Sequence, residues 1–444
     1  MRVIRHLIKL SFILVASVPM HGQTGGINPY SVYGLGWNQS RQLTYGQMLG
    51  EASSAWRSAL YVNPAQPASY ADLRFTTLDL GGFYQSMHQS NTENALWNST
   101  GGFREFAIAM PLHRRIGLAA GLRPYTIVAY DMYTEDSSDT FGKVSRGFRG
   151  SGGLSETYVG LAWRPAKWFA IGANAYYRFG SQERNEIVQF EGSLLDDVHS
   201  VERVMVSGWN YEIGSQLTIP MGTTRMTLAA TYEPTGRLNA WYDDYAYTFY
   251  ANSAGGEVVR DSLVQAIGLE GYTYTGSQMT WGLSLQRPAV NLPIDAWTIN
   301  LGYRSMNATE IVRFSTGTTG PSDYQENVQL YSGSMTIVPA LAFPERYMKG
   351  YASQIAYRAS FNSMNSGLVI EGNAVNQWNT TLGIGLPLGG ASLVPGDRKF
   401  ATLNLGMQLG QVGSHNNGLI QELQIRGLVG LTLNDQWFQE RKYR

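Results

Sequence analysis

The chain has 444 residues, of which 43% are hydrophobic and only 15% are charged. The charged fraction lies well below the roughly 25% of an average soluble domain, and the 50 Gly and 27 Tyr disfavour a helical protein because both are weak helix formers. Basic and acidic residues are equal at 33 each, which argues against nucleic acid as a partner. The chain has 0 Cys, so disulfides, zinc–thiolate sites and thiol nucleophiles are excluded.

The first 22 residues have the layout of an export signal. Arg2, Arg5 and Lys9 precede an apolar run from Leu10 to Pro19. This run is far shorter than the roughly 20 residues that a membrane-spanning helix needs, so a cleaved signal is favoured over an anchor helix. We therefore predict a signal peptide over residues 1–22. An exported chain can be soluble, or it can be a β-barrel in an outer membrane.

Most of the remaining sequence alternates with a period of two. Between Leu423 and Leu433, for example, odd positions are mostly apolar and even positions are mostly polar or small. This pattern predicts strands with one apolar face. The apolar runs extend over about 9–11 residues, as tilted membrane strands require, whereas strands of a soluble sandwich average about 5–6.

The predicted connections between these strands are of two alternating kinds. Short turns, such as residues 111–115 and 164–168, alternate with longer polar segments, such as 134–153, 181–200 and 251–272. Short periplasmic turns and long outer loops are typical of outer-membrane barrels. We predict an all-β protein: a transmembrane antiparallel β-barrel of about 14 strands over residues 72–444, in the outer membrane of a Gram-negative bacterium.

Residues 23–71 do not follow the strand pattern. They are polar and Gly-rich, with an amphipathic patch from Leu43 to Leu60. Because a wide barrel needs its lumen filled or gated, we predict that this segment is a plug, or hatch. The alternative is a periplasmic tail.

Short motifs in this segment resemble the hatch of the FadL-like outer-membrane transport proteins. The stretches are Gly34–Gly36, Leu49–Ser53 and Tyr61–Ala65, and the last contains the Asn63-Pro64-Ala65 motif. The ends of the chain, residues 28–36 and 431–443, resemble the Bacteroidota branch of this family. The resemblance implies a 14-strand barrel with an N-terminal plug. It also implies uptake of hydrophobic, fatty-acid-like molecules through a lumen pocket, a hatch and a lateral opening.

Pro124 lies in the predicted strand 116–130 and lacks the N–H that a regular central ladder requires. In the FadL-like family the kinked strand is also the third. Gly121 and Pro124 are therefore the candidate positions of a lateral opening. The alternative is an ordinary bulge, since Pro339 also lies in a predicted strand.

The charges predicted to face the lumen are mostly arginines. One hypothesis is that some of them bind the carboxylate head group of a ligand. The alternative is a polar lumen lined by paired charges and water. The candidates are Arg123, Arg178, Arg225, Arg304 and Arg358.

The sequence contains few motifs that would indicate an enzyme. The predicted mature chain has four histidines without metal-ligand spacing (His88, His113, His199 and His415), and it lacks a Gly-x-Ser-x-Gly elbow. We predict no enzyme activity, no cofactor and no metal site. The expected partners are outer-membrane lipid and a hydrophobic ligand. Because FadL-like barrels also serve in type IX secretion translocons, the resemblance leaves open a second role as a subunit or plug of a larger machine with protein partners.

Overall fold

The structure is a computed structural model that describes residues 28–91, 94–138, 142–191, 195–251, 256–289, 294–307, 312–314, 317–319, 327–343, 350–370, 372–388, 399–415 and 419–437. The predicted signal peptide lies outside these ranges. No helix within them is long and apolar enough to cross a membrane.

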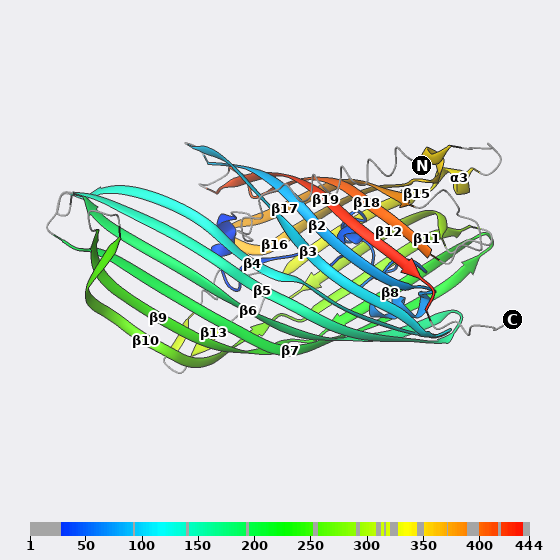
Figure 1. Cartoon of the computed structure of the whole chain (residues 1–444), viewed down its shortest axis with the longest axis horizontal. Helices are drawn as coiled ribbons and strands as arrows, with labels where there is room; N and C mark the ends of the chain where they lie inside the picture. The colour runs from blue at the N-terminus through cyan, green and yellow to red at the C-terminus, as the bar shows by residue number, and fades with distance from the viewer. Residues whose placement is uncertain are drawn as a thin grey trace.

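One antiparallel sheet closes on itself to form a barrel (Figure 1). Closure occurs where β19 pairs with β2 along the whole of both strands. The strands of the wall are β2 (Thr76–Ser90), β3 (Ala95–His113), β4 (Ile116–Ser138), β5 (Gly142–Ala166), β6 (Phe169–Glu191), β7 (Asp197–Met221), β8 (Thr224–Glu233), β9 (Gly236–Ala251), β10 (Glu257–Thr275), β11 (Gln278–Pro288), β12 (Asp295–Met306), β15 (Val328–Ile337), β16 (Ala356–Ile370), β17 (Asn373–Leu388), β18 (Lys399–Val412) and β19 (Gln421–Asp435).

The barrel has 14 strands, as the sequence predicted. Two of them are interrupted: β8 continues as β9 after Pro234, and β10 continues as β11 after Gly276. The two breaks lie side by side, because Gly236 pairs with Thr275 and Glu233 pairs with Gln278. The strand predicted as continuous over residues 224–248 is thus divided at its proline, which cannot donate to the ladder.

The predicted outer loops at residues 134–153, 181–200 and 251–272 are wrong, because most of their residues continue the strands. β4, β5, β6, β7, β9 and β10 extend well past their neighbours and form an outer extension of the wall (Figure 1, left). In this extension, exposed ion pairs join neighbouring strands. The outward-facing apolar residues that are typical of the rest of the wall are replaced by charged ones. One of these ion pairs joins Arg203 Nη2 to Glu183 Oε2 at 2.7 Å, and hydrogen bonds from Arg203 and Asn185 lower the pKa of Glu183.

The wall is apolar outside and polar inside. In β8, for example, Leu228 and Tyr232 are exposed, whereas Thr227 and Thr231 are buried. Trp209, 69% exposed, packs beside Tyr177 on the outer surface below the extension. Aromatic side chains favour the membrane interface because one edge is apolar and the other can hydrogen-bond.

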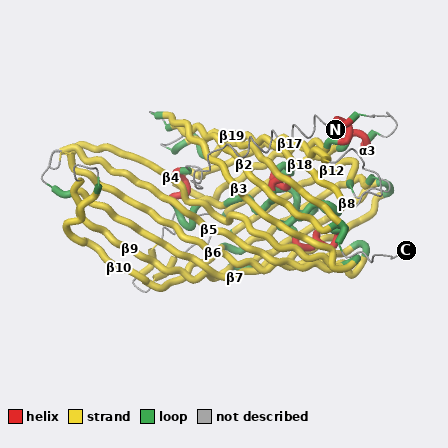
Figure 2. The backbone as a smooth tube through the Cα atoms, in the orientation of Figure 1, coloured by secondary structure: helices red, strands yellow, loops and turns green. Residues whose placement is uncertain are grey.

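Residues 28–75, which we call the N-terminal segment, fill the middle of the barrel, where Figure 2 shows their short helices enclosed by strands. Its elements are η1 (Pro29–Val32), β1 (Trp37–Asn38), α2 (Thr44–Gln47) and η2 (Pro67–Asp72). Asn28 and Gln66 cap the two 3₁₀ helices by accepting hydrogen bonds from the N–H groups of Tyr30 and Ala68. Leu43, Tyr45, Val62 and other apolar residues of the segment form a core with Ala107 and Tyr158 of the wall.

Glycines in the wall make room for η2. A Cβ atom on Gly172 would lie 2.6 Å from the backbone carbon of Pro67 and 2.7 Å from the nitrogen of Ala68. Gly117 lies against the backbone of Tyr70 in the same way, whereas Gly214 faces the side chains of Gln66 and Pro67. A backbone contact cannot be relieved by a change of side-chain rotamer, so Gly117 and Gly172 require glycine.

We expect Gly172→Ala to displace η2 and to lower the temperature at which the folded barrel converts to the unfolded band on semi-native electrophoresis. Overpacking of this kind costs about 1–3 kcal/mol. Gly427→Ala is the matched control, because the nearest atom to a Cβ there is Tyr84 O at 3.7 Å. Equal transition temperatures for the two variants would contradict the close packing of η2 on the wall.

Candidate functional site in the barrel lumen

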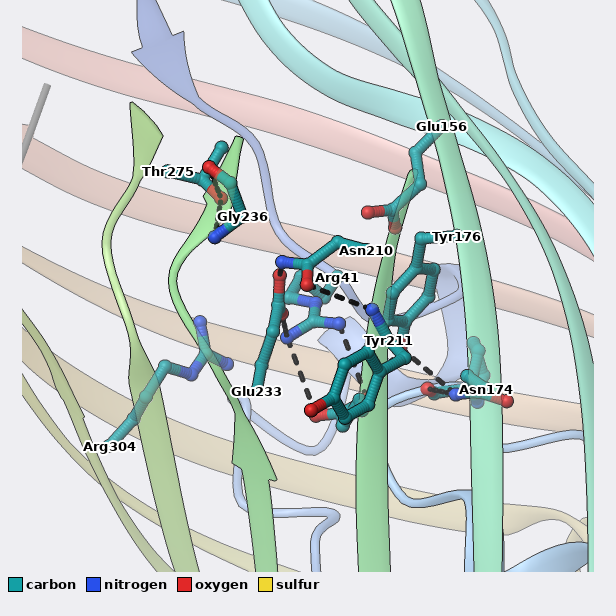
Figure 3. A network of polar contacts seen from close by, with 12 residues as sticks. Arg41, Glu156, Asn174, Tyr176, Asn210, Tyr211, Glu233, Gly236, Thr275 and Arg304 are labelled. Atoms are coloured by element: carbon teal, nitrogen blue, oxygen red, sulfur yellow. Dashed lines mark hydrogen bonds and ion pairs between the residues drawn. The ribbon is translucent and has the colours of Figure 1, made fainter. Parts of the chain in front are cut away.

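A buried cluster of ion pairs joins the N-terminal segment to the wall. Arg41 donates to two wall carboxylates: its Nη2 lies 3.3 Å from Glu212 Oε2, and its Nη1 lies 2.9 Å from Glu233 Oε2 (Figure 3). Tyr176 donates a further hydrogen bond of 2.5 Å to Glu212. Arg41 is the single charged residue between Asn28 and Gly50, a signal in the sequence that the prediction of site residues missed.

A second layer of the cluster ties four strands of the wall together, β4, β5, β6 and β8. Arg178 lies 2.5 Å from Glu233 and 2.8 Å from Glu156, and Arg123 lies 2.6 Å from Glu156. Arg123 also donates to the backbone oxygen of Arg41. Three arginines and three glutamates thus neutralise one another, and none of their side chains is more than 6% exposed.

The other three predicted head-group arginines also have partners within the protein. Arg225 pairs with Asp295 at 3.1 Å, and Arg304 pairs with Glu51 of the N-terminal segment. Arg358 donates to Asn404 Oδ1 at 2.9 Å and to the Tyr61 hydroxyl at 3.3 Å.

The structure therefore brings only Arg123 and Arg178 together, through Glu156. The other three candidates contact neither of them. This geometry matches the alternative of a lumen lined by paired charges. The sequence could not distinguish head-group binding from paired charges, because the partner of each arginine comes from a different strand or from the N-terminal segment.

The motif Asn63-Pro64-Ala65 forms a buried turn in the N-terminal segment. Asn63 donates to the backbone oxygen of Ser53 at 2.7 Å, and the backbone oxygen of Pro64 accepts a 3.0 Å hydrogen bond from Asn174 on β6. Ala65 is half-buried beside them. The motif thus links two turns of the segment to each other and to the wall.

Two adjoining cavities occupy the outer half of the lumen, with empty volumes of about 1140 and 1070 Å³ that include space open to solvent. Trp37, Asn38 and Gln39 separate them. The first has an aromatic and apolar part that includes Tyr30, Tyr33, Tyr125 and Leu368, and Arg41, Glu233 and Arg304 line it as well. The second is rich in amide side chains, among them Gln47, Gln85, Asn362, Asn379, Gln408 and Gln424.

The wall is incomplete between β3 and β4. β3 pairs with β2 along most of its length, but it pairs with β4 only from Phe106/Leu122 to His113/Ile116. Beyond Leu122, no ladder joins residues 95–105 of β3 to residues 123–138 of β4 among the described residues. We call this gap the seam.

The predicted lateral-opening residues lie at the base of the seam. Gly121 is paired with Ala107 near the end of the ladder, and a Cβ there would lie 2.6 Å from the backbone oxygen of Phe106. Pro124 lies two residues past the last β3–β4 pair, and the register between β4 and β5 shifts just after it.

The N-terminal segment covers part of the β4 edge at the seam. β1 pairs antiparallel with residues 126–127 of β4. The backbone N–H groups of Asn28 and Gln39 donate to the carbonyl oxygens of Ala129 and Tyr125, at 2.6 and 2.9 Å. The second cavity reaches the same place, since Asn28 and Ile127 are part of its lining.

A closed 14-strand barrel with a segment of its own chain packed in the lumen has the fold of FadL-type barrels. A Pseudomonas aeruginosa FadL homologue superposes with a TM-score of 0.57 over 90% of this chain and 100% of its own, at 9% identity. The Pseudomonas putida toluene transporter TodX gives a TM-score of 0.45 over 87% of this chain and 96% of its own, at 10% identity.

By sequence, the chain belongs to the BamG family, whose family model matches residues 3–444. No curated protein matches the chain.

We expect Arg41→Gln to loosen the N-terminal segment, because it leaves Glu212 and Glu233 with less positive charge in a buried site. Breaking a buried ion pair from one side costs about 3–5 kcal/mol. The variant should unfold at a lower temperature, and its segment should be cleaved faster by a protease added to the purified barrel.

The control for this prediction is Arg149→Gln, which removes an ion pair with Asp131 that is more than half exposed on both sides. Exposed pairs contribute about 0–1 kcal/mol, so this variant should behave like the unmodified protein. Identical protease sensitivity of the Arg41 and Arg149 variants would show that the cluster does not hold the segment.

Proposed function

We propose that this protein is an outer-membrane barrel through which hydrophobic, fatty-acid-like molecules enter the cell envelope by way of the seam. The observation that carries the proposal is the broken β3–β4 ladder next to a lumen cavity. The ladder is missing over the stretch of β3 that pairs with residues 81–90 of β2, which is the outer two-thirds of that strand. A gap at this level faces the outer leaflet, where hydrophobic molecules partition.

The proposal requires the N-terminal segment to move. Below the cavities, the lumen is closed by the tilted rings of Tyr45, Trp56 and Tyr61, which pack on one another, and by the Arg41 cluster. A molecule that enters from the seam meets β1 first, because β1 covers the β4 edge there. We infer that β1 acts as a latch, and that its release from β4 connects the cavity to the seam.

We expect a disulfide between Asn38→Cys and Thr126→Cys to block uptake, because these two residues are register partners across β1 and β4. The chain has 0 Cys, so no other thiol competes. The measurement is the initial rate at which cells that produce the barrel take up the hydrophobic dye N-phenyl-1-naphthylamine. The rate should fall to that of cells without the barrel and return on reduction.

The two single-cysteine variants are the matched controls, because each carries one substitution and cannot form the bond. Their uptake should equal that of the unmodified barrel. An unchanged rate in the fully oxidised double variant would overturn the latch, and an equal rate in cells lacking the barrel would overturn uptake itself.

A second candidate function is that of a component in a larger outer-membrane assembly, and it is favoured by an edge of β10 that no described residue covers. Between Glu257 and Glu270, β10 pairs with β9 on one side and with no described residue on the other. Val259, Leu263 and Ile267 on this stretch are 57%, 55% and 62% exposed. Open edges that carry apolar side chains are sites where other chains add strands.

For this second role, we expect Leu263→Pro to abolish stoichiometric co-purification of a partner from native outer membranes in mild detergent, because proline interrupts the strand that an added strand would pair with. Barrel integrity is checked on the same sample by heat-modifiability. A barrel that purifies alone, with or without the substitution, would count against the assembly role.

A further inference from the structure

One lumen arginine differs from all those described above. Arg426 lies on β19, faces the second cavity and is half-buried. Its Nε donates a 2.7 Å hydrogen bond to Gln85 Oε1, and its guanidinium lies 5.5 Å from the centre of the Phe83 ring. These two contacts fix the plane of the guanidinium.

The rest of this guanidinium is open to the cavity. Neither Nη1 nor Nη2 makes a hydrogen bond or an ion pair with any residue that the structure describes. Arg358 also lacks a carboxylate partner, but both of its Nη atoms are hydrogen-bonded, to Asn404 and Tyr61. Arg426 thus presents two parallel donors on a fixed plane, which is the geometry that binds a carboxylate or phosphate in bidentate fashion.

The carboxylates near Arg426 have other partners: Glu51, which lines the same cavity, is paired with Arg304. The main charge acting on Arg426 is another cation, Arg104, which is itself paired with Glu105 at 2.9 Å. Glu422 lies on the same strand, but its carboxylate accepts hydrogen bonds from Gln89 and Gln424. An unpaired charge at membrane depth is costly, so it indicates a ligand or a pathway.

The walls around Arg426 add groups that donate and accept hydrogen bonds. Gln85, Asn362, Asn379 and Gln424 are nearly fully buried, and all four line the same cavity. Apolar side chains, including Phe83 and Met87, complete the lining. Asn379 donates to Asn362 at 3.1 Å and Gln424 donates to Glu422 at 3.0 Å, so the amides hold one another in place. An amide carries two donors and two acceptor positions, so polar substituents on an anionic head group would find further hydrogen-bond partners in this wall.

We propose that the second cavity is a binding site for an oxyanion, a carboxylate or phosphate, on the polar head of an amphiphile, with Arg426 as its bidentate anchor. This proposal rests on the proposed uptake function and specifies the class of ligand that is taken up. It depends on the uptake route only for how the ligand reaches the cavity. Binding to the purified barrel and uptake by cells can therefore fail independently.

The test measures binding to the purified full-length barrel in a neutral detergent by isothermal titration. The probes are octyl phosphate, octanoate, inorganic phosphate and the uncharged octyl glucoside. We expect octyl phosphate or octanoate to bind, Arg426→Gln to weaken that binding at least tenfold, and Arg426→Lys to weaken it less. Arg149→Gln, on the outer extension, should leave it unchanged.

The probes also separate the two sources of an oxyanion. Binding of the charged amphiphiles but not of inorganic phosphate supports a lipid-like ligand. Equal binding of inorganic phosphate, lost in Arg426→Gln, overturns the amphiphile but retains the anion site. Binding that is the same in Arg426→Gln as in the unmodified barrel overturns the site, provided that the variant keeps the unfolding temperature of the unmodified barrel.

Discussion

The structure depends on the ion pairs that Arg41 makes with Glu212 and Glu233. Charges taken out of water must be paired and hydrogen-bonded, or their desolvation exceeds what they gain. Here Glu156 and Glu233 each meet two arginines and Glu212 meets one. Arg41 of the N-terminal segment pairs with both Glu212 and Glu233. The cluster is neutral only when that segment is seated, so the segment and the outer part of the wall stabilise each other.

The same dependence explains how the barrel tolerates a break in its wall. Lipid offers no hydrogen bonds, so an exposed strand edge in the hydrocarbon region is unfavourable. At the seam, β1 and Asn28 supply backbone partners to the β4 edge from inside the barrel. The chain between β1 and the Arg41 anchor is only two residues long, so the cluster that fixes the segment also holds β1 on the edge. The same segment therefore fills the lumen and covers part of the β4 edge.

The sequence predicted what depends on local pattern and missed what depends on distant partners. Alternation along the strands was sufficient for the 14-strand barrel, because each wall residue faces either lipid or lumen. It failed in the outer extension, where polar strands pair through exposed ions such as Arg203–Glu183 and have the composition of loops. Pro124 was visible as a ladder breaker, but the length of the seam was not, because it depends on which β3 residues find partners.

The lumen arginines also show that the sequence alone does not identify partners on distant strands. The alternation of side chains along a strand places both Arg178 and Arg426 in the lumen. No neighbouring residue in the sequence shows that one is paired and the other is not. Arg178 meets Glu156 and Glu233 from two other strands, whereas the Nη atoms of Arg426 meet no described side chain. An unpaired charged residue says more about ligand binding than a paired one, because an ion pair within the protein already explains why a paired charge is buried. The amide wall around Arg426 and the aromatic side chains beyond Trp37 together form a lumen that offers both hydrogen-bonding and apolar surface. That combination suits an amphiphile better than a plain hydrocarbon, because each half of such a molecule finds a matching surface.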